Sequence, residues 1–204
     1  MDTEADGTNL GSLSLQNPSS ASTVISNILK KYGYHPSLFM DQNNAENEPT
    51  FLHNCRMVFT KNLKLVYIEA EVRSDSIDTG KNPDEDGLAH VKSRGAPGDI
   101  PAQYISQRLG GDGSAGNVYP AKPNIDLSES EISQNTVYNF VKDRKDRKAK
   151  LSFGLINEEC NEDDDWMTEK YYFRPLEIYY KFELFENDKI VGTTLEGKID
   201  NKLL

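Results

Sequence analysis

The stretch from Gly98 to Asp126 reads GDIPAQYISQRLGGDGSAGNVYPAKPNID and holds the densest run of turn-forming residues in the chain. A short segment of apolar and polar residues, 103–109, leads into Gly110 and Gly111, and a glycine-rich loop follows over 112–116. Loops of this kind often carry binding or catalytic residues on a rigid scaffold. We therefore take this stretch as the part of the chain around which fold and function are organised.

Strand signals precede this stretch and a helix signal follows it. Residues 55–60 and 63–72 are predicted as two strands joined by a turn at Lys61 and Asn62, and the second is apolar on both faces near its middle, which is typical of a buried strand. A further short strand is predicted at 88–91. Residues 128–148 read as a helix that opens with a capping box, Ser128 with Glu131,.

The last third of the chain alternates apolar and polar residues, which is typical of strands. Leu151, Phe153 and Leu155 alternate, and a long strand is predicted over 176–184,. The sequence Glu186-Asn187-Asp188-Lys189 predicts a hairpin turn, after which residues 190–199 return,. Between these strands, residues 158–165 form an acidic loop. The element order predicts an α+β fold with a mostly antiparallel sheet.

Residues 1–50 are expected to form a flexible N-terminal arm with one short helix, and residues 51–204 to form one domain. Residues 1–22 are rich in Ser, Asn, Gly and Thr, a composition that favours disorder. Residues 24–29 carry Val, Ile and Leu at helical spacing after Ser22 and Thr23, and Gly33 is expected to end this helix,.

Composition limits the classes of function. The net charge is −10, which disfavours non-specific affinity for a phosphate backbone, because that affinity comes largely from Lys and Arg. Cys55 and Cys160 have no metal-ligand spacing, and we expect free thiols in an intracellular protein,. One disulfide in an exported protein is the alternative. No apolar run approaches 18 residues and the N-terminus does not resemble a secretory signal, so we expect no membrane span.

From about Lys64 to Asn201 the layout resembles the DNA/RNA non-specific endonucleases, in particular their toxin-like branch. The similarity includes the Gly-Gly turn, the segment Asn117-Val118-Tyr119-Pro120, the helix after it, Arg174-Pro175 before a long strand, and an Asn, Asn201, at the end of the closing hairpin. The resemblance implies a ββα-metal nuclease fold with a site at the glycine-rich stretch.

In that family a His acts as general base on a water molecule beside one hydrated Mg²⁺, and an Asn on the following helix is the main protein ligand. On this pattern Asp99 matches the leading Asp, and Gln103 occupies the position of the base. Asn124 and Asp126 lie near the expected metal position. A carboxamide accepts no proton near neutral pH, and loss of a positioned base costs about 10²- to 10⁴-fold in rate.

Other residues are candidates for the remaining roles. His90 lies 13 positions before Gln103 on the predicted strand and is the candidate for a relocated base. Arg94, Arg108 and Asn117 are candidates for substrate contacts. Each residue also has an interpretation without chemistry: a surface histidine, solvated arginines, or an ordinary loop residue. The basic run 142–148 is read mainly as a helix end, where cations favour the helix dipole.

Three hypotheses follow. The first is a nuclease-fold protein that lacks the base and binds nucleic acid or a protein partner, so that it is not an enzyme. The second is an active Mg²⁺-dependent nuclease with His90 as its base. The third is a structural or self-assembling protein, which would form a homo-oligomer.

Overall fold

The computed structural model describes residues 19–32, 52–157 and 173–203. It confirms the α+β class with a mostly antiparallel sheet. The elements in chain order are α1 (Ala21–Tyr32), β1 (His53–Phe59), β2 (Leu65–Arg73), α2 (Glu85–Arg94), β3 (Ile100–Gln103), the 3₁₀ helix η3 (Gln107–Leu109), β4 (Val118–Ala121), α3 (Ser128–Val141), β5 (Arg147–Asn157), β6 (Pro175–Glu186), β7 (Lys189–Ile190) and β8 (Leu195–Asp200).

The main sheet has the strand order β1-β2-β5-β6, with β7 and β8 both paired to β6, and every pairing is antiparallel. The alternating residues of β5 and β6 form its centre: Phe153 pairs with Ile68 on one side and Tyr180 on the other. The turn between β6 and β7 places Asn187 and Asp188 at positive φ, as a tight hairpin turn requires. The predicted strands at 55–60, 63–72 and 176–184, and the hairpin turn, are confirmed.

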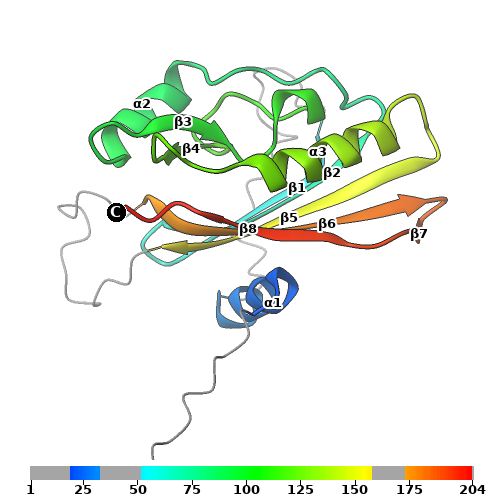
Figure 1. Ribbon diagram of the computed structural model, residues 1–204, viewed down its shortest axis with the longest axis horizontal. Helices are drawn as coiled ribbons and strands as arrows, with labels where there is room; N and C mark the ends of the chain where they lie inside the picture. The colour runs from blue at the N-terminus through cyan, green and yellow to red at the C-terminus, as the bar shows by residue number, and fades with distance from the viewer. Residues whose placement is uncertain (1–18, 33–51, 158–172, 204) are drawn as a thin grey trace, which may run out of the picture.

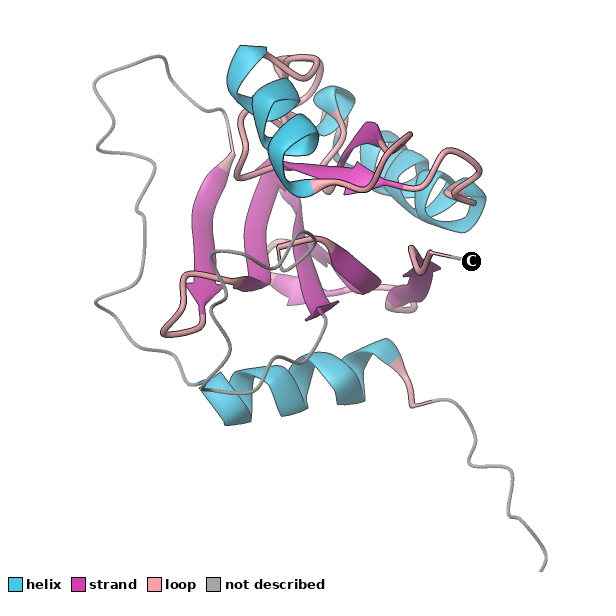
Figure 2. Cartoon of the chain, turned by 90° about the vertical axis from the view of Figure 1, so that its left-hand side faces the viewer, coloured by secondary structure: helices cyan, strands magenta, loops and turns pink. Residues whose placement is uncertain are grey.

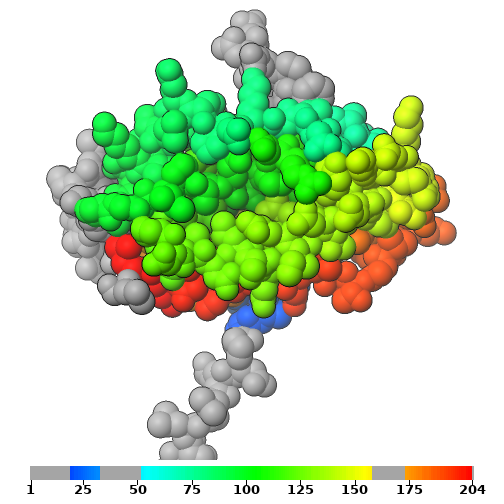
Figure 3. Space-filling model, turned by 45° about the horizontal axis from the view of Figure 1, so that its top comes forward, coloured from blue at the N-terminus to red at the C-terminus, as the bar shows by residue number. Residues whose placement is uncertain are grey.

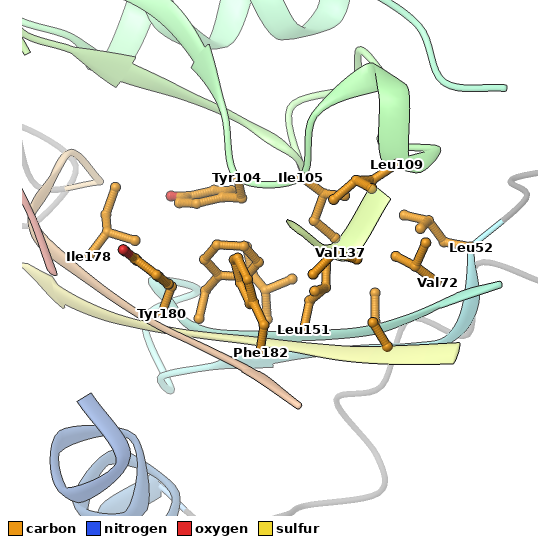
Figure 4. Close-up of a cluster of buried hydrophobic side chains, with 14 of the residues drawn as sticks. Leu52, Val72, Tyr104, Ile105, Leu109, Val137, Leu151, Ile178, Tyr180 and Phe182 are labelled. Carbon is orange, nitrogen blue, oxygen red and sulfur yellow. The ribbon is translucent and has the colours of Figure 1, made fainter. Parts of the chain in front are cut away.

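A second layer covers one face of this sheet. It consists of α2, the two-stranded β3–β4 hairpin, η3 and α3, which all lie above the sheet in Figure 1. The main hydrophobic core lies between the two layers (Figure 4): Tyr104, Ile105 and Val137 face Leu151 and Phe182. In the space-filling view of Figure 3, residues of this layer, drawn in green, lie above the C-terminal strands, drawn in orange and red.

Helix α1 packs on the opposite face of the sheet (Figure 2). Ile25 and Ile28 form a second hydrophobic cluster there with Val58, Val66 and Tyr67. The predicted short helix is therefore confirmed, and its apolar residues lie against the sheet. Residues 1–18 of the expected arm, and the acidic loop at 158–165, lie outside the described residues.

The prediction of a strand at 88–91 is wrong, because these residues belong to helix α2. The Asp84 carboxylate accepts a hydrogen bond from the backbone N–H of Gly87 and caps the helix, and Gly87 and Val91, four positions apart, form its buried face,. A segment of four residues with mixed apolar and polar side chains fits both a strand and a helix. The Asp84 cap is the feature that distinguishes the helix here.

The predicted helix at 128–148 ends seven residues early, at Val141. Lys142 leaves the helical conformation and Asp143 takes a positive φ, after which Arg147–Lys150 pair with β2 and β6. Sheet pairing overrides local helix propensity here. The capping box is also absent: the Asp126 carboxylate, rather than the Ser128 hydroxyl, accepts hydrogen bonds at the helix start.

None of the helices in the described residues is long and apolar enough to cross a membrane. Cys55 is in no disulfide within the described residues, and Cys160 lies outside the described ranges.

Candidate functional site

Residues 107–113, which lead into the glycine-rich loop, are paired with the segment 78–84. Backbone N–H groups of Asp78 and Gly80 donate to the carbonyl groups of Arg108 and Gln107, at 2.9 and 3.0 Å. The N–H groups of Lys81 and Asp84 donate to the carbonyl groups of residues 111 and 113, at 2.9 and 3.0 Å. Four of the carbonyl groups in and beside the loop are therefore bound by protein backbone instead of being open to a ligand.

The glycines of this region permit close backbone contact. A Cβ on Gly111 would lie 1.9 Å from the carbonyl oxygen of Ile105, and one on Gly113 would lie 2.1 Å from that of Asn82. A Cβ on Gly87 of α2 would lie 2.2 Å from the carbonyl oxygen of Gly113. These distances exclude any side chain. The glycines that suggested a ligand-binding loop thus serve, at these positions, to pack three backbone segments together.

Asn117 holds the two ends of the loop together from inside. Its Oδ1 accepts from the N–H of Ile105 at 2.9 Å, and its Nδ2 donates to the carbonyl groups of Ile105 at 2.9 Å and Asp112 at 2.8 Å. The residue is buried, and both amide hydrogens are engaged. Asn117, a candidate for substrate contact, is therefore placed as an internal clamp of the loop.

Gln103 ends β3 beside the same loop. Its Nε2 donates to the carbonyl groups of Lys81, at 2.9 Å, and Asp112, at 2.7 Å. Both donor hydrogens of the carboxamide are thus used to join the 78–84 segment to the glycine-rich loop. The sequence resemblance assigns the general base to the position of Gln103. The side chain there bridges two backbone segments, and a carboxamide cannot accept a proton near neutral pH.

Asp99 lies in a buried ion pair with Arg174. The guanidinium donates from Nε to Oδ2 at 2.7 Å and from a terminal nitrogen to Oδ1 at 3.2 Å, and both side chains are at most 2% exposed. Arg174 also donates to the backbone carbonyl and side-chain Oδ1 of the buried Asn201. Asn201 in turn donates to the carbonyl groups of Pro120 and Pro175.

This network joins three residues that the sequence pattern singled out separately. It ties the start of β3, the start of β6 and the residue after β8 into one buried unit. Sequence spacing gave no indication that Asp99 and Arg174, 75 positions apart, form a pair. In the sequence, Asp99 is marked only by its place before a turn, and Arg174 only by the proline and the long strand that follow it.

His90 lies on helix α2, one turn from Asp86 and one turn from Arg94. Burial lowers the pKa of its imidazole, the Arg94 guanidinium lowers it further, and the Asp86 carboxylate partly opposes them. The lowered pKa favours the neutral form of the imidazole, which is the form that acts as a base,. Within the described residues it makes no hydrogen bond to Asp99, Gln103 or Asn117.

The two candidate arginines are fixed by aromatic rings. The Arg94 guanidinium lies 4.2 Å from the ring centre of Phe173. That of Arg108 lies 3.9 Å from the ring centre of Tyr138, and its terminal nitrogen donates to Oδ1 of Asn135 at 2.8 Å. Arg108 is exposed, so a guanidinium of fixed orientation faces solvent on η3. Such a group suits phosphate or carboxylate ligands.

The basic run 142–148 is largely neutralised by neighbouring carboxylates. Arg144 contacts Asp146 at 2.8 Å and Glu186 at 3.1 Å, and Arg147 contacts Glu186 at 2.8 Å. These ion pairs favour the structural interpretation of the run over an anion-binding one.

The candidate metal residues lie on the surface just before α3. Asn124 and Asp126 are exposed, and the Asp126 carboxylate accepts from the N–H and hydroxyl groups of Ser128 at 3.0 and 2.6 Å. These hydrogen bonds lower the pKa of Asp126. Across the described ranges, no group of three or more His, Cys, Asp or Glu side chains could hold a metal ion. The sequence resemblance implies only one main Asn ligand beside bound water, so a magnesium ion at Asn124 or Asp126 stays a prediction.

A small pocket lies between the β1–β2 edge and the glycine-rich loop. Its lining is mainly apolar, from Leu52, Met57, Ile68 and Ile105, and Asn117 contributes to its wall. Cys55, Arg56, Glu69 and Asp112 also line the pocket, so a thiol and charged groups lie beside its apolar surface.

No protein-family model and no curated protein matches the chain. A solved structure described as an extracellular endonuclease is similar, with a TM-score of 0.48 and 6% identity, over 81% of this chain and 89% of the other.

Proposed function

We propose that this chain is a nuclease-fold protein, resembling the DNA/RNA non-specific endonucleases, that binds a partner and does not cleave phosphodiesters. The proposal rests on the sequence resemblance and on the order of elements: paired strands, a glycine-rich stretch leading to Asn117, the helix α3, and a long strand that starts beside Arg174.

One observation carries the proposal. Gln103 stands where the resemblance requires a general base, and its carboxamide is bound to the carbonyl groups of Lys81 and Asp112. Water activation at that point would need a proton acceptor with a pKa near neutrality, which this side chain is not. Four carbonyl groups of residues 107–113 also accept from the backbone of residues 78–84, so they are not open to a ligand.

For the partner, we infer an anionic ligand, with nucleic acid as the first candidate and an acidic protein surface as the second. Arg108 supports this inference, because it is exposed, held in place by Tyr138 and Asn135, and makes no ion pair in the described structure. The net charge of −10 predicts weak affinity, because few cations face the phosphate backbone.

The test combines a cleavage assay with a binding assay. Plasmid DNA and RNA incubated with the protein and Mg²⁺ or Mn²⁺ should remain intact at high protein concentration. Fluorescence anisotropy with labelled DNA and RNA should then detect binding that weakens as the salt concentration rises. Arg108→Ala should lower the affinity, and it should lower the slope of log affinity against log salt concentration by about 1. Arg144→Ala is the matched control, because Arg144 is already paired with Asp146. Cleavage above background would contradict the proposal.

The alternative is an active metal-dependent nuclease in which His90 is the base. The lowered pKa of its imidazole, caused by burial and by the Arg94 guanidinium, favours the neutral form that a general base requires,. The test compares cleavage by the wild type with cleavage by a His90→Ala variant. If the wild type cleaves and the variant does not, the alternative is established. A third candidate, self-assembly without a ligand, predicts neither cleavage nor Arg108-dependent binding.

A further inference from the structure

A second cation lies beside Arg108, the residue that supports the proposed function. The Arg108 guanidinium, on η3, lies over the ring of Tyr138, 3.9 Å from its centre. The ammonium group of Lys142, the residue after α3, lies 5.3 Å from the same ring centre. Because both distances end at one point, the two cations can be at most about 9 Å apart. The packing of η3 against α3 thus brings together two cations that are 34 positions apart in the sequence.

Neither of these cations forms an ion pair in the described part of the chain. Arg144 and Arg147, in the same basic run as Lys142, both pair with Glu186. Arg108 and Lys142 are instead exposed to solvent. Two like charges held close together repel each other, and an anion bound to both relieves this repulsion. This pair of cations therefore has the charge and the exposure that an anion-binding site requires.

The side chains around the two cations hold them in position. The Arg108 guanidinium donates to Oδ1 of Asn135 at 2.8 Å. Hydrogen bonding to the Tyr138 side chain raises the pKa of the Lys142 ammonium, and nearby negative charge adds to this effect. The Tyr138 hydroxyl group also donates to Oδ2 of Asp78 at 2.8 Å. The Asp78 carboxylate thus lies beside the cations and offsets part of their charge, so it competes with an incoming anion.

We propose that Arg108 and Lys142 together bind one phosphate group of a nucleic acid. The inference rests on the proposed function and assigns the chemical group that the site recognises. The acceptor oxygens of a phosphate group point in several directions, whereas the two oxygens of a carboxylate lie in one plane. The guanidinium lies over the face of the Tyr138 ring and the ammonium is hydrogen-bonded to the Tyr138 side chain. Donors that approach from different directions suit phosphate better than carboxylate, and so nucleic acid better than an acidic protein surface.

A double-mutant cycle tests whether both cations bind the same group. Anisotropy with labelled single-stranded DNA at low salt gives the affinity of the full chain and of its Arg108→Ala, Lys142→Ala and doubly substituted variants. Each single substitution should lower the affinity about two- to five-fold. The double variant should lose less than the product of the two factors, because each cation binds the phosphate less well without the other. Lys145→Ala removes an exposed cation three positions from Lys142, and this matched control should keep the wild-type affinity.

Removal of the competing carboxylate should act in the opposite direction. In Asp78→Asn the side chain still accepts from the Tyr138 hydroxyl group but carries no charge, so the affinity for DNA should rise by about two- to five-fold. Glu85→Gln removes one negative charge from an exposed residue of α2, and it should raise the affinity less. Lys142→Arg keeps the charge and should keep the affinity. Circular dichroism checks that every variant is folded.

A small phosphate compound gives a readout that needs no nucleic acid. In proton–nitrogen NMR spectra of the full chain, tripolyphosphate should shift the Nε–H resonance of Arg108 and the backbone amide resonance of Lys142. Citrate at equal ionic strength should bind more weakly, because it offers carboxylates only. The inference is overturned if tripolyphosphate moves neither resonance or if citrate binds as tightly. It is also overturned if Lys142→Ala lowers the DNA affinity no more than Lys145→Ala does.

These outcomes are distinguishable from those that test the proposed function. Cleavage above background would contradict the proposed function and leave the phosphate contact of the two cations standing. DNA binding that depends on Arg108 but not on Lys142 would overturn the shared site and leave the proposed function standing. Losses that simply multiply in the double variant would also overturn it, since cations that bind separate groups are not coupled. Binding of neither DNA nor tripolyphosphate would overturn both.

Discussion

At the scale of single residues, the hydroxyl group of Tyr119 is the clearest departure from ordinary packing. In the described part of the chain it is the only buried side-chain oxygen or nitrogen without a hydrogen-bond partner. The ring stacks on that of Tyr104, with centroids 4.6 Å apart, and burial raises the pKa of the Tyr119 phenol above its ordinary value. The aromatic ring contributes to the core, but the hydroxyl group is buried at a cost.

We predict that Tyr119→Phe stabilises the protein by about 1 kcal/mol, because it removes an unpaired polar group and keeps the ring. The matched control is Tyr67→Phe. The Tyr67 hydroxyl donates to Glu69 at 2.6 Å, so its removal should destabilise by about 1–3 kcal/mol. Urea unfolding measures the free energy of unfolding of both variants, which should rise in Tyr119→Phe and fall in Tyr67→Phe. A Tyr119→Phe protein less stable than wild type would contradict the interpretation.

At the scale of elements, the glycine-rich loop depends on the side chain of Asn117. The N–H and the carbonyl of the buried residue Ile105 both find their partner in this carboxamide, which also donates to the carbonyl of Asp112. Asn117→Ala should therefore destabilise by about 2–4 kcal/mol, since the two Ile105 groups lose their partner away from water, whereas the Asp112 carbonyl keeps its bond from Gln103. Asn135→Ala, at an exposed amide, should change the stability by less than about 0.5 kcal/mol.

Hydrogen exchange locates the effect. The amide of Ile105 should lose protection in Asn117→Ala before the amides of β5 do, because only the loop is released. An unchanged Ile105 amide in a destabilised variant would mean that Asn117 acts elsewhere.

The corner between α3 and β5 should respond to acid. Hydrogen bonds from Arg144 lower the pKa of Asp146 from 3.8 to about 2. A carboxyl group whose folded-state pKa is depressed contributes stability above its unfolded pKa and loses this contribution as pH falls through the folded value. The contribution of Asp146 is thus present above about pH 4 and decreases between about pH 4 and pH 2,.

Asp146→Asn should consequently flatten the dependence of unfolding free energy on pH in that window, as measured by urea titrations at several pH values. The exposed neighbour Asp143 provides the matched control, Asp143→Asn. If both substitutions change the slope of unfolding free energy against pH equally, the contact between Arg144 and Asp146 is not the source of the pH dependence.

At the scale of the whole molecule, the buried pair of Arg174 and Asp99 joins the upper layer to the main sheet. Arg174→Met leaves the Asp99 carboxylate buried without its partner and should cost about 3–5 kcal/mol. Replacing both residues, Arg174→Met with Asp99→Leu, should recover part of this loss, because no charge then remains unpaired. A double variant no more stable than Arg174→Met would show that the hydrogen bonds to Asn201 dominate.

The sequence alone determined the local features of this protein. Alternation in 151–155 and 176–184 predicted the central strands, the pair Asn187-Asp188 predicted the hairpin, and the spacing in 24–29 predicted α1. These signals depend on neighbours within a few residues, where side-chain periodicity and turn chemistry act. In α2, a short segment fits both the two-residue period of a strand and the 3.6-residue period of a helix. Its secondary structure therefore could not be predicted from the sequence alone.

Only the tertiary structure decided the state of the candidate site. The absence of a base at Gln103 is visible in the sequence, but its bonds to Lys81 and Asp112 are not. The pairing of Asp99 with Arg174 and the packing of 78–84 along the glycine-rich loop are likewise contacts between distant positions. Each arises because buried polar groups must find partners wherever the folded backbone places them, and no spacing along the chain encodes that choice.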